Sequence, residues 1–358
     1  MTHVTVIAEA GVNHNGSTDL ALRLVDAAAD AGADIVKFQT FKADKLVTAN
    51  APRAEYQARN TGVADDQQSM LRGLELDAAA HRRIVNHCKA RGIVFLSTPF
   101  DDESTDLLTE TLGLRLVKVG SGDMTNGPHL LRLAWRGLDI ILSTGMATMD
   151  EVAEALGVIA YGYSGGQTPA RAAFAEALAR PDLRHMLARK VTLLHCTSNY
   201  PAPADEINLA VMDSFRAAYP LPVGFSDHSD GIAIAIAAVG RGAVMIEKHL
   251  TLDRKLPGPD HVASIEPADF ARMVLAIREV ERAIGSPVKT PTPSERKTMP
   301  VARKSIVAAR RITAGETFTM ENLAIKRPGT GLGPNVLWDL FGKHAPRDFA
   351  LDESVTER

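Results

Sequence analysis

The stretch VGFSDHSDGIAIAIAAVGRGAVMIEKHL, residues 223–250, contains two short apolar runs separated by a segment of small residues. This pattern predicts two buried strands joined by a helix, with His228 ending the first strand and His249 ending the second. Neighbouring strands of a parallel sheet lie about 4.8 Å apart, so both imidazoles project from the same edge and can share one metal ion. The stretch therefore predicts a parallel α/β fold with a site at the carboxyl ends of its strands.

The same alternation of strand-length and helix-length segments runs through most of the chain. The predicted strands are 4–10, 33–40, 92–99, 114–121, 138–145, 191–198, 222–228 and 243–250. The predicted helices include 20–31, 78–91, 149–160, 213–218 and 267–284. Eight strand–helix units in about 285 residues predict a (β/α)₈ TIM barrel. An open doubly wound sheet is the alternative, but such a sheet concentrates its chemistry at one switch point.

Polar side chains follow nearly every predicted strand, as expected for a barrel with its chemistry at the carboxyl edge. Besides the two histidines, they are Glu9, Asn13, His14, Lys37, Gln39, Thr98, Lys118, Ser121, Ser143, Thr144, Thr197, Ser198 and Asn199. So regular a distribution favours one extended active site over a purely structural role.

The domain organisation follows from changes in pattern along the chain. Residues 1–285 form the predicted barrel, and the Pro-rich, charged stretch 286–300 is a predicted linker. Residues 301–358 contain short β-like runs at 305–309 and 323–326 and predict a small, mostly β domain. Such a domain has little core of its own, so we expect it to dock on the barrel or on a partner chain.

Two long segments interrupt the barrel pattern. Residues 41–71 contain Tyr56, Arg59 and Asn60 and suit a loop over the barrel mouth. Residues 161–189, rich in Gly, Pro, Ala and Arg, are expected to be a peripheral insertion.

Composition excludes several classes of protein. The 358 residues are 45% hydrophobic and 23% charged with a net charge of −3, which offers no basic stripe for nucleic acid. No run approaches the roughly 20 apolar residues that span a bilayer, and no secretory signal precedes the first strand, so we expect a cytoplasmic protein. Cys88 and Cys196 alone give neither a disulfide framework nor a thiolate metal site.

Lys37, Lys118 and Ser121, the last in VKVGSG, form a predicted anion pocket. Two ammonium groups supply charge, while hydroxyl groups and backbone amides beside glycine supply shape. A phosphorylated, acidic small molecule fits such a pocket. Alternatively, a strand-end lysine can be the Schiff-base nucleophile of a lyase or aldolase.

His228 and His249 provide neutral nitrogen ligands and leave positions on a metal ion open for water and substrate. Manganese or magnesium fits this mixed shell, although ligand number alone does not separate them from zinc or cobalt. Asp227 and Glu247 are expected to orient the histidines, and Glu9, across the closed barrel, is the candidate acid/base.

Two further residues are candidates for substrate contacts. Asp260 lies in the Pro-rich loop LPGPDHVAS and is either a turn cap or an acceptor for sugar hydroxyls. Arg327 lies in KRPGTGL of the tail. It could be an ordinary surface charge, but the neighbouring Pro and Gly residues indicate a rigid loop that holds its side chain in a fixed position.

Together these motifs resemble those of bacterial sialic acid synthases, a TIM barrel followed by an antifreeze-like (SAF) domain. The matching segments are IAEAGVNHNG (7–16), VKFQT (36–40), STPF (97–100), VKVGSG (117–122), ILSTGM (141–146), HCTSNYPAP (195–203), FSDH (225–228), EKH (247–249), PGPDH (257–261) and KRPGTG (326–331). The resemblance covers nearly the whole chain.

The resemblance implies condensation of phosphoenolpyruvate with N-acetylmannosamine and water to N-acetylneuraminate, with release of phosphate and a divalent metal, Mn²⁺ first and Mg²⁺ or Co²⁺ as alternatives. It places the metal on His228 and His249 and the catalytic carboxylate on Glu9. The implied phosphoenolpyruvate contacts are Lys37, Thr98, Lys118, Ser121 and Ser226, with Ser198 where some members use Asn as a phosphate contact. The implied sugar contacts are Gln39, Asn60, Tyr200, Asp260 and Arg327.

The resemblance also implies a homodimer in which Arg327 reaches the site of the other subunit through a swapped tail. Related synthases use the same chemistry on 2,4-diacetamido sugars to make legionaminic or pseudaminic acid, which is the alternative function. A less favoured alternative is a pyruvate aldolase, which would release no phosphate. A non-catalytic role, with a carbohydrate- or ice-binding tail, would leave the polar residues at the barrel mouth unexplained.

Overall fold

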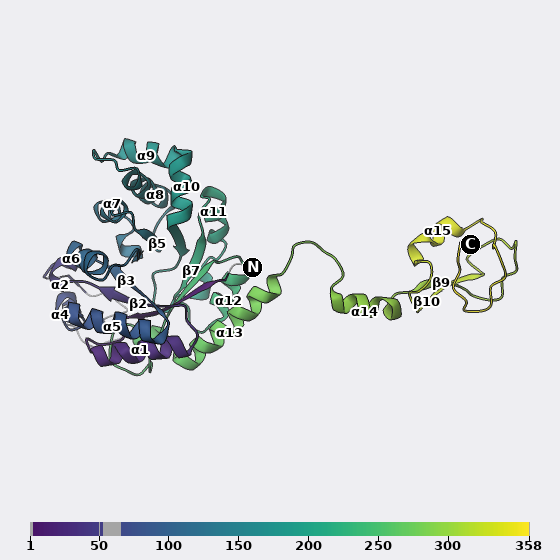
Figure 1. Ribbon diagram of the computed structural model, residues 1–358, viewed down its shortest axis with the longest axis horizontal. Coiled ribbons are helices and arrows are strands. Elements are labelled where there is room, and N and C mark those ends of the chain that lie inside the picture. Colours follow the sequence, from purple (N-terminus) through teal and green to yellow (C-terminus); the bar gives the residue numbers. More distant parts are fainter. Residues whose placement is uncertain (1–2, 50, 53–65, 358) are drawn as a thin grey trace. The chain divides into compact units, whose positions relative to one another are not determined.

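Eight parallel strands form the first unit of the molecule in this computed structural model, which describes residues 3–49, 51–52 and 66–357 (Figure 1). The order is β3-β2-β1-β8-β7-β6-β5-β4, each strand hydrogen-bonded to the next, and the two outer strands β3 and β4 also contact each other. The predicted barrel is confirmed, and the open doubly wound sheet is wrong. The strands are β1 (Thr5–Gly11), β2 (Ile35–Thr40), β3 (Val94–Pro99), β4 (Leu116–Val119), β5 (Asp139–Ser143), β6 (Val191–His195), β7 (Val223–Asp227) and β8 (Met245–His249).

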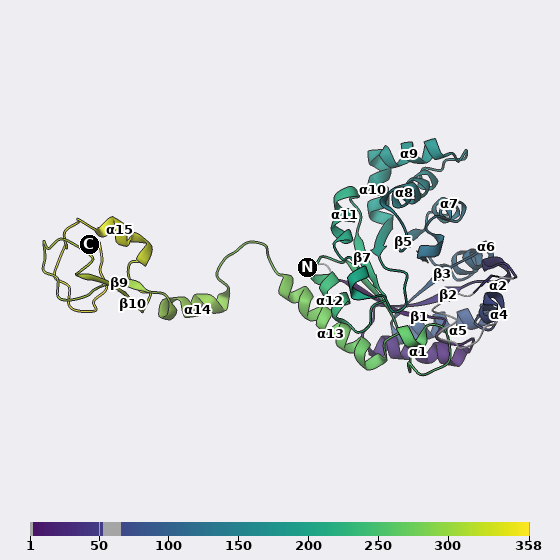
Figure 2. The ribbon, with the colours of Figure 1, turned by 180° about the vertical axis from the view of Figure 1, so that it is seen from behind.

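Helices surround this sheet, as Figures 1 and 2 show from opposite sides. They are α1 (Thr18–Asp30), α2 (Ala43–Leu46), α4 (Gln67–Arg72), α5 (Ala78–Arg91), α6 (Asp102–Asp106), α7 (Gly127–Trp135), α8 (Met149–Tyr163), α9 (Arg171–Ala179), α10 (Pro181–Lys190), α11 (Val211–Ala218), α12 (Ala233–Gly240) and α13 (Pro267–Ile284). Single turns are η1 (Leu107–Thr111), η2 (Ser121–Asp123), η3 (Ala204–Glu206) and η4 (His261–Ala263).

Local sequence explains where several helices begin and end. The Ser17 and Asp77 side chains accept hydrogen bonds from backbone amides of the first turns of α1 and α5. Thr148 and Glu151 form a reciprocal capping box at the start of α8. Gly92 ends α5 in the left-handed conformation, at φ 69°. No described helix is long and apolar enough to cross a membrane.

The barrel core has an inner and an outer layer because side chains alternate along each strand. Ile7, Ile35, Leu96, Ile141 and Leu194 pack together inside the barrel. The alternate residues face the helices and form the large outer core. This inner apolar layer fills the barrel toward the amino ends of its strands. The residues two positions further along each strand lie next to it, on the side of the carboxyl ends.

Both long insertions form helices. In residues 161–189, α9 packs on α8 and Phe174 contacts Tyr161, with ring centroids 5.3 Å apart. The segment is helical where its composition predicted only an insertion, because alanine supplies most of its apolar side chains and leaves a weak period. In the excursion after β2, α2 and α4 enclose an apolar cluster with Val12, whereas Tyr56, Arg59 and Asn60 lie outside the described residues.

The contacts divide the chain into a unit Met1–Gly285, which holds the barrel, and a unit Ser286–Arg358. In the second, β9 (Ser305–Ala308) and β10 (Leu323–Lys326) are antiparallel, and η5 (Pro334–Val336) and α15 (Leu337–Leu340) follow. Their core includes Ile306, Ile312, Phe318, Phe349 and Val355. An additional helix, α14 (Pro293–Ala302), begins inside the predicted linker at a Thr292–Glu295 capping box.

Candidate active site

A cavity of about 540 Å³ opens at the carboxyl ends of the barrel strands. Its lining brings together the predicted residues Glu9, Lys37, Gln39, Thr98, Lys118, Ser121, Ser198, Tyr200, Ser226, His228, His249 and Asp260. Asn60 lies outside the described residues, and Arg327 is an exposed residue of the second unit. The sequence thus predicted most of the polar lining.

Strand alternation explains why these side chains converge. Residues two positions beyond the inner apolar layer point into the same space. Ile7 is thus followed by Glu9, and Ile35 is followed by Lys37. In β8, Met245, Glu247 and His249 are spaced two residues apart and therefore point to the same side of the strand. A polar layer therefore lies on an apolar one, and the active site rests on the barrel core.

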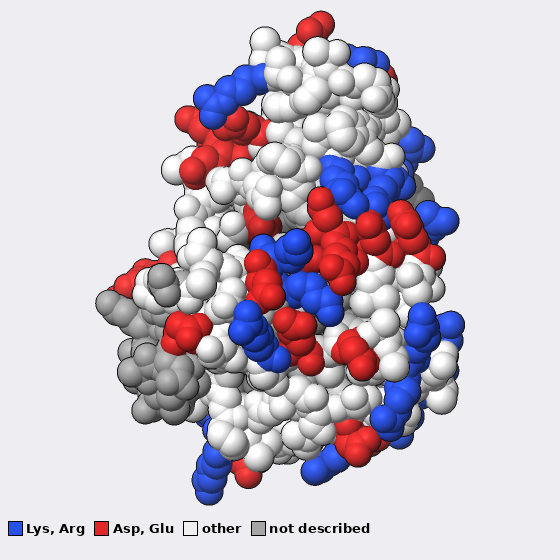
Figure 3. Space-filling view, turned by 90° about the vertical axis from the view of Figure 1, so that its left-hand side faces the viewer, with Lys and Arg blue, Asp and Glu red and all other residues white. Residues whose placement is uncertain are grey.

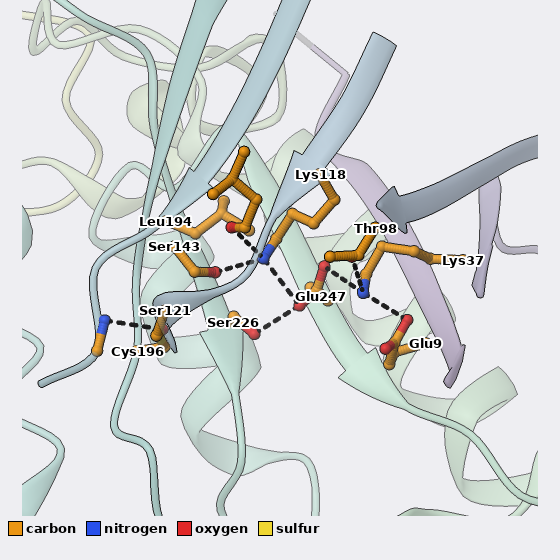
Figure 4. Close-up of polar contacts among 12 residues, drawn as sticks. Glu9, Lys37, Thr98, Lys118, Ser121, Ser143, Leu194, Cys196, Ser226 and Glu247 are labelled. Atoms are coloured by element: carbon orange, nitrogen blue, oxygen red, sulfur yellow. Dashed lines mark hydrogen bonds and ion pairs between the residues drawn. The ribbon is translucent and has the colours of Figure 1, made fainter. Parts of the chain in front are cut away.

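Two lysines and two carboxylates form a buried charge network in the polar layer (Figure 4). Lys37 Nζ lies 2.7 Å from Glu9 Oε2 and 3.7 Å from Glu247 Oε2. Lys118 Nζ lies 3.9 Å from Glu247 Oε1 and donates to Ser143 Oγ at 2.6 Å. Glu247 therefore lies between the two ammonium groups.

The network gives its carboxylates opposite acidities. Burial raises the pKa of Glu9 to about 7, although Lys37 opposes the change. Burial acts in the same direction on Glu247, but Lys118 and Lys37 outweigh it and hold the pKa of that carboxyl well below its usual range. Near neutral pH, Glu247 is an anion, whereas Glu9 can exchange a proton.

The lysines also differ. Burial would lower the pKa of Lys37, but Glu247 and Glu9 together raise it, so this side chain stays charged. Burial lowers the pKa of Lys118, with Glu247 opposing and Lys37 reinforcing the change. An incoming anion would favour the charged form of Lys118.

Small polar groups complete the wall around Lys118. Ser121 Oγ accepts a hydrogen bond from the Gly145 amide at 3.0 Å and lies 3.2 Å from Cys196 Sγ. A Cβ atom at Gly145 would come within 2.3 Å of Ser198 Oγ, so only glycine allows these groups to approach. The wall offers hydroxyl and lysine donors and suits an oxyanion.

His228 and His249 lie side by side in the cavity wall, with ring centroids 5.5 Å apart and ring planes at 68°. The ring of Tyr200 lies 4.2 Å from that of His228 between centroids. His228 Nδ1–H donates to the Thr197 carbonyl at 2.7 Å, which fixes its tautomer and leaves Nε2 unprotonated, 3.3 Å from Ser226 Oγ. Burial lowers the pKa of His228 to about 4 and lowers that of His249 well below its usual range, so both imidazoles are neutral at pH 7.

These residues fit a divalent metal ion that completes its shell with water or substrate. Neutral imidazoles are the form that binds metals, and His249 Nδ1 is buried without a hydrogen-bond partner among the described residues. Among the residues that the structure describes, no three or more His, Cys, Asp and Glu side chains are grouped closely enough to hold a metal ion. The arrangement therefore suits an open site and not a closed structural one.

Asp227 and Glu247 do not orient the histidines as expected. Asp227 points out of the barrel and binds Lys248 at 2.8 Å, while Glu247 accepts from Ser226 Oγ at 2.8 Å between the two lysines. For His228, a backbone carbonyl supplies the orienting contact instead. Alternation along β7 places the Asp227 side chain on the opposite face from His228, whereas Glu247 lies on the same face as His249 and contacts Ser226 and the lysines instead.

Ser143 was noted only as a strand-end residue, and it contacts Lys118 directly. An apolar wall of the cavity was not predicted at all. It consists of Val12, Leu46, Val47, Met70, Leu71, Leu74, Phe100 and Met146. Alternation along β5 could have identified Ser143, whereas the wall depends on how α2 and α4 fold back over the barrel. Outside the cavity, Lys and Arg are interspersed with Asp and Glu on the face shown in Figure 3.

Comparison with known proteins supports a specific family. The NeuB family model matches residues 24–289, and the SAF domain model matches residues 303–357. The N,N'-diacetyllegionaminic acid synthase of Campylobacter jejuni is 43% identical over 357 residues, covering 100% of each chain. That of Legionella pneumophila is 41% identical and covers 94% of this chain and 89% of its own.

A solved structure agrees with these matches. The N-acetylneuraminic acid synthetase of Leptospira borgpetersenii, in complex with citrate, has 31% sequence identity and a TM-score of 0.66. The alignment covers 82% of this chain and 90% of that one. The chain therefore belongs to the NeuB family and is a nonulosonic acid synthase with a C-terminal SAF domain.

Proposed function

We propose that this synthase condenses phosphoenolpyruvate with a 2,4-diacetamido hexose and water to give a legionaminic-type nonulosonic acid and phosphate. The observation that carries the proposal is the position of two buried lysines beside two neutral, neighbouring histidines in one cavity. The lysines suit an anionic enol donor, and the histidines suit the aldehyde end of the acceptor. Lysine and hydroxyl groups that serve an oxyanion argue against the Schiff-base alternative.

The donor is held by the polar layer. Lys37 and Lys118 bind its carboxylate and phosphate charges, and the hydroxyls of Thr98, Ser121 and Ser226 orient it. Ser198, beside Gly145, lies at the same wall. The enol carbon is thereby held close to the acceptor, and bulk water is kept away from it.

The reaction requires one proton transfer to the acceptor and two from the added water. As the enol carbon bonds to the aldehyde carbon, Glu9 gives a proton to the aldehyde oxygen, which becomes a hydroxyl. Water then adds to the former enol carbon and returns a proton to Glu9. The carbon–oxygen bond to phosphate breaks as the keto group forms, and the phosphate leaves with the proton of the new hydroxyl group. The pKa of about 7 that burial gives Glu9 suits both of the transfers in which it takes part.

We further propose that His228 and His249 hold a divalent ion, Mn²⁺ first and Mg²⁺ or Co²⁺ as alternatives. When bound, such an ion polarises the aldehyde as a Lewis acid. The orphaned Nδ1 of His249 supports this assignment.

The acceptor is proposed to carry two acetamido groups. The two legionaminic acid synthases are 43% and 41% identical to the chain, compared with 31% for the sialic acid synthetase. The apolar wall offers a surface for the additional acetyl methyl group. N-acetylmannosamine, the acceptor first expected from the sequence, is therefore the second candidate. Gln39, Tyr200 and Asp260 are proposed to contact the acceptor, together with Asn60 outside the described residues.

The test is a phosphate-release assay with phosphoenolpyruvate and a panel of amino-hexose aldehydes, with and without Mn²⁺. We expect metal-dependent phosphate release with the highest kcat/KM for the 2,4-diacetamido hexose. A higher value with N-acetylmannosamine would restore the sialic acid assignment. No phosphate release, with a borohydride-reducible adduct formed from pyruvate, would identify an aldolase.

We also propose a homodimer in which the second unit of one subunit brings Arg327 to the site of the other. Arg327 is exposed and lies in a loop that packs on α14, where the Gly329 amide donates to the Pro300 carbonyl at 2.7 Å. Mixing inactive His228→Ala chains with inactive Arg327→Ala chains should restore activity after subunit exchange. No recovery, despite exchange confirmed by mass spectrometry, would place Arg327 in its own chain or outside the site.

A further inference from the structure

A buried ion pair lies on the outer side of the two strands that carry the histidines. Lys248 Nζ donates to Asp227 Oδ2 at 2.8 Å, and both side chains are 0% exposed. Lys248 also donates to the Ser229 carbonyl at 2.6 Å. Asp227 Oδ1 accepts from the amide and the hydroxyl of Ser229 at 2.9 and 2.6 Å. The pair is therefore a closed network with several satisfied partners.

Stability alone does not explain such a pair. Removing two charges from water costs several kcal/mol each, and well-packed apolar residues of similar volume are often as stabilising or more so. A buried pair fixes geometry, however, because a charged donor and acceptor are strongly penalised if they separate.

The network involves the residues directly before and after His228 in the sequence. Asp227 and Lys248 are directly opposite each other and are the last paired positions between β7 and β8. His228 lies just beyond that pairing, and its carbonyl accepts a hydrogen bond from the Ala202 amide at 2.8 Å. Lys248 binds Asp227 on one side of His228 and Ser229 on the other, and it directly precedes His249. The Lys248 ammonium group thus links the residues on both sides of His228 to β8, the strand that carries His249.

We propose that Asp227 and Lys248 are positioning residues that set the separation of His228 and His249, and thereby the affinity of the site for a divalent metal. The inference rests on the proposed metal-binding role of the histidines. Neither residue enters the cavity, because both face the helices while the histidines face inward. Their effect on the reaction is therefore indirect.

The test replaces the ion pair by a neutral pair of similar size, Asp227→Asn with Lys248→Met. Asn keeps an oxygen for the Ser229 contacts and Met fills the volume of the lysine stem. Mn²⁺ binding is measured without substrates, from the electron paramagnetic resonance signal of free Mn²⁺. We expect binding to weaken by about 10-fold to 100-fold, the usual effect of losing a contact that orients a metal ligand. Circular dichroism should match the parent protein.

A kinetic measurement separates positioning from general damage. The Mn²⁺ concentration for half-maximal activity should rise by a similar factor, while kcat at saturating Mn²⁺ should recover most of its value. A purely structural role would change thermal stability and leave this activation constant unmoved. If the double variant does not fold, Ser229→Ala removes only one contact of Asp227 and should weaken Mn²⁺ binding by a smaller, measurable factor.

Arg278→Met is the matched control. Arg278 binds Asp34 at 2.8 Å at the amino end of the barrel, far along the strands from the histidines. We expect a lower Tm and unchanged Mn²⁺ affinity. A folded Asp227→Asn, Lys248→Met protein with parental Mn²⁺ affinity would overturn the positioning role. A parent protein that binds no Mn²⁺ would overturn the metal site and, with it, this inference.

Discussion

Charged side chains on the two faces of β7 and β8 differ in how completely their hydrogen bonds are formed. On the outer face, Asp227 and Lys248 form a network in which every named contact is between 2.6 and 2.9 Å. On the inner face, Glu247 approaches Lys37 and Lys118 at 3.7 and 3.9 Å, and Glu247 Oε2 is buried without a hydrogen bond. The residues are neighbours in sequence, so the difference arises from the direction in which each side chain points.

The comparison separates a structural use of charge from a functional one. A closed network holds the backbone and has no capacity for a ligand. An open network keeps charged groups in place but leaves donors and acceptors that a substrate can satisfy. Substitutions on the inner face should therefore lower turnover directly, whereas substitutions of the outer pair should act through the affinity for metal.

The largest expected effect is on the inner face at His249. His249→Gln should lower kcat/KM by about 10³-fold, because metal polarisation of an aldehyde contributes several kcal/mol to transition-state stabilisation. The control is His87→Gln, which changes only a half-buried hydrogen bond to Asp26, far from the cavity lining. Activity in the His249 variant close to that of the control would remove this residue from the mechanism.

Lys118→Met tests the anion pocket itself. Loss of a buried charged contact to an anionic substrate should raise the KM for phosphoenolpyruvate by about 10²-fold and change the sugar KM much less. Lys190→Met is the control, since Lys190 pairs with Asp139 at the amino end of β5. Equal changes in both Michaelis constants would argue against a donor-specific role for Lys118.

Strand ends and their chemistry were predictable from the sequence because two physical rules suffice for them. Apolar runs alternating with helical periods give the barrel, and the carboxyl ends of its strands converge. The lining at Glu9, Lys37 and Lys118 follows from counting two residues beyond an inner apolar position.

Other features were not predictable because they depend on contacts between distant segments. The contact of Glu247 with both lysines, the pairing of Asp227 with Lys248, and the apolar wall require the three-dimensional register of strands and loops. Helix α14 was missed for a different reason, since its residues are almost all exposed and leave no apolar period.

Gly224→Ala tests whether the inner face below the site is as tightly packed as its apolar layer indicates. A Cβ atom at Gly224 would lie 2.5 Å from the Met245 carbonyl oxygen and 2.6 Å from Leu194 Cδ2. Backbone cannot yield easily, so we expect the free energy of unfolding to fall by about 1–3 kcal/mol in urea denaturation. Gly240→Ala at the end of α12 has nothing within 4 Å of its added methyl group and should be neutral or stabilising. Equal stability of the two variants would contradict tight packing beneath the site.

The smallest expected effect concerns the rim of the cavity, where Asp260 is a buried carboxyl. Burial raises its pKa from 3.8 to about 6, with Lys37 opposing the change. Between pH 4 and 6, the folded chain therefore keeps a proton that the unfolded chain has released, so stability falls as pH rises through this window.

Asp260→Asn lacks this titration. The stability of the parent protein relative to the variant should therefore fall by about 1–2 kcal/mol between pH 4 and pH 7, measured by urea denaturation at each pH. Glu9 also has a raised pKa, but it is present in both proteins and cancels in the comparison. Asp205→Asn, at an exposed carboxyl in η3, is the control and should show no such difference. If the relative stability of the Asp260 variant did not change with pH, this carboxyl would be solvated in solution, and burial would not raise its pKa.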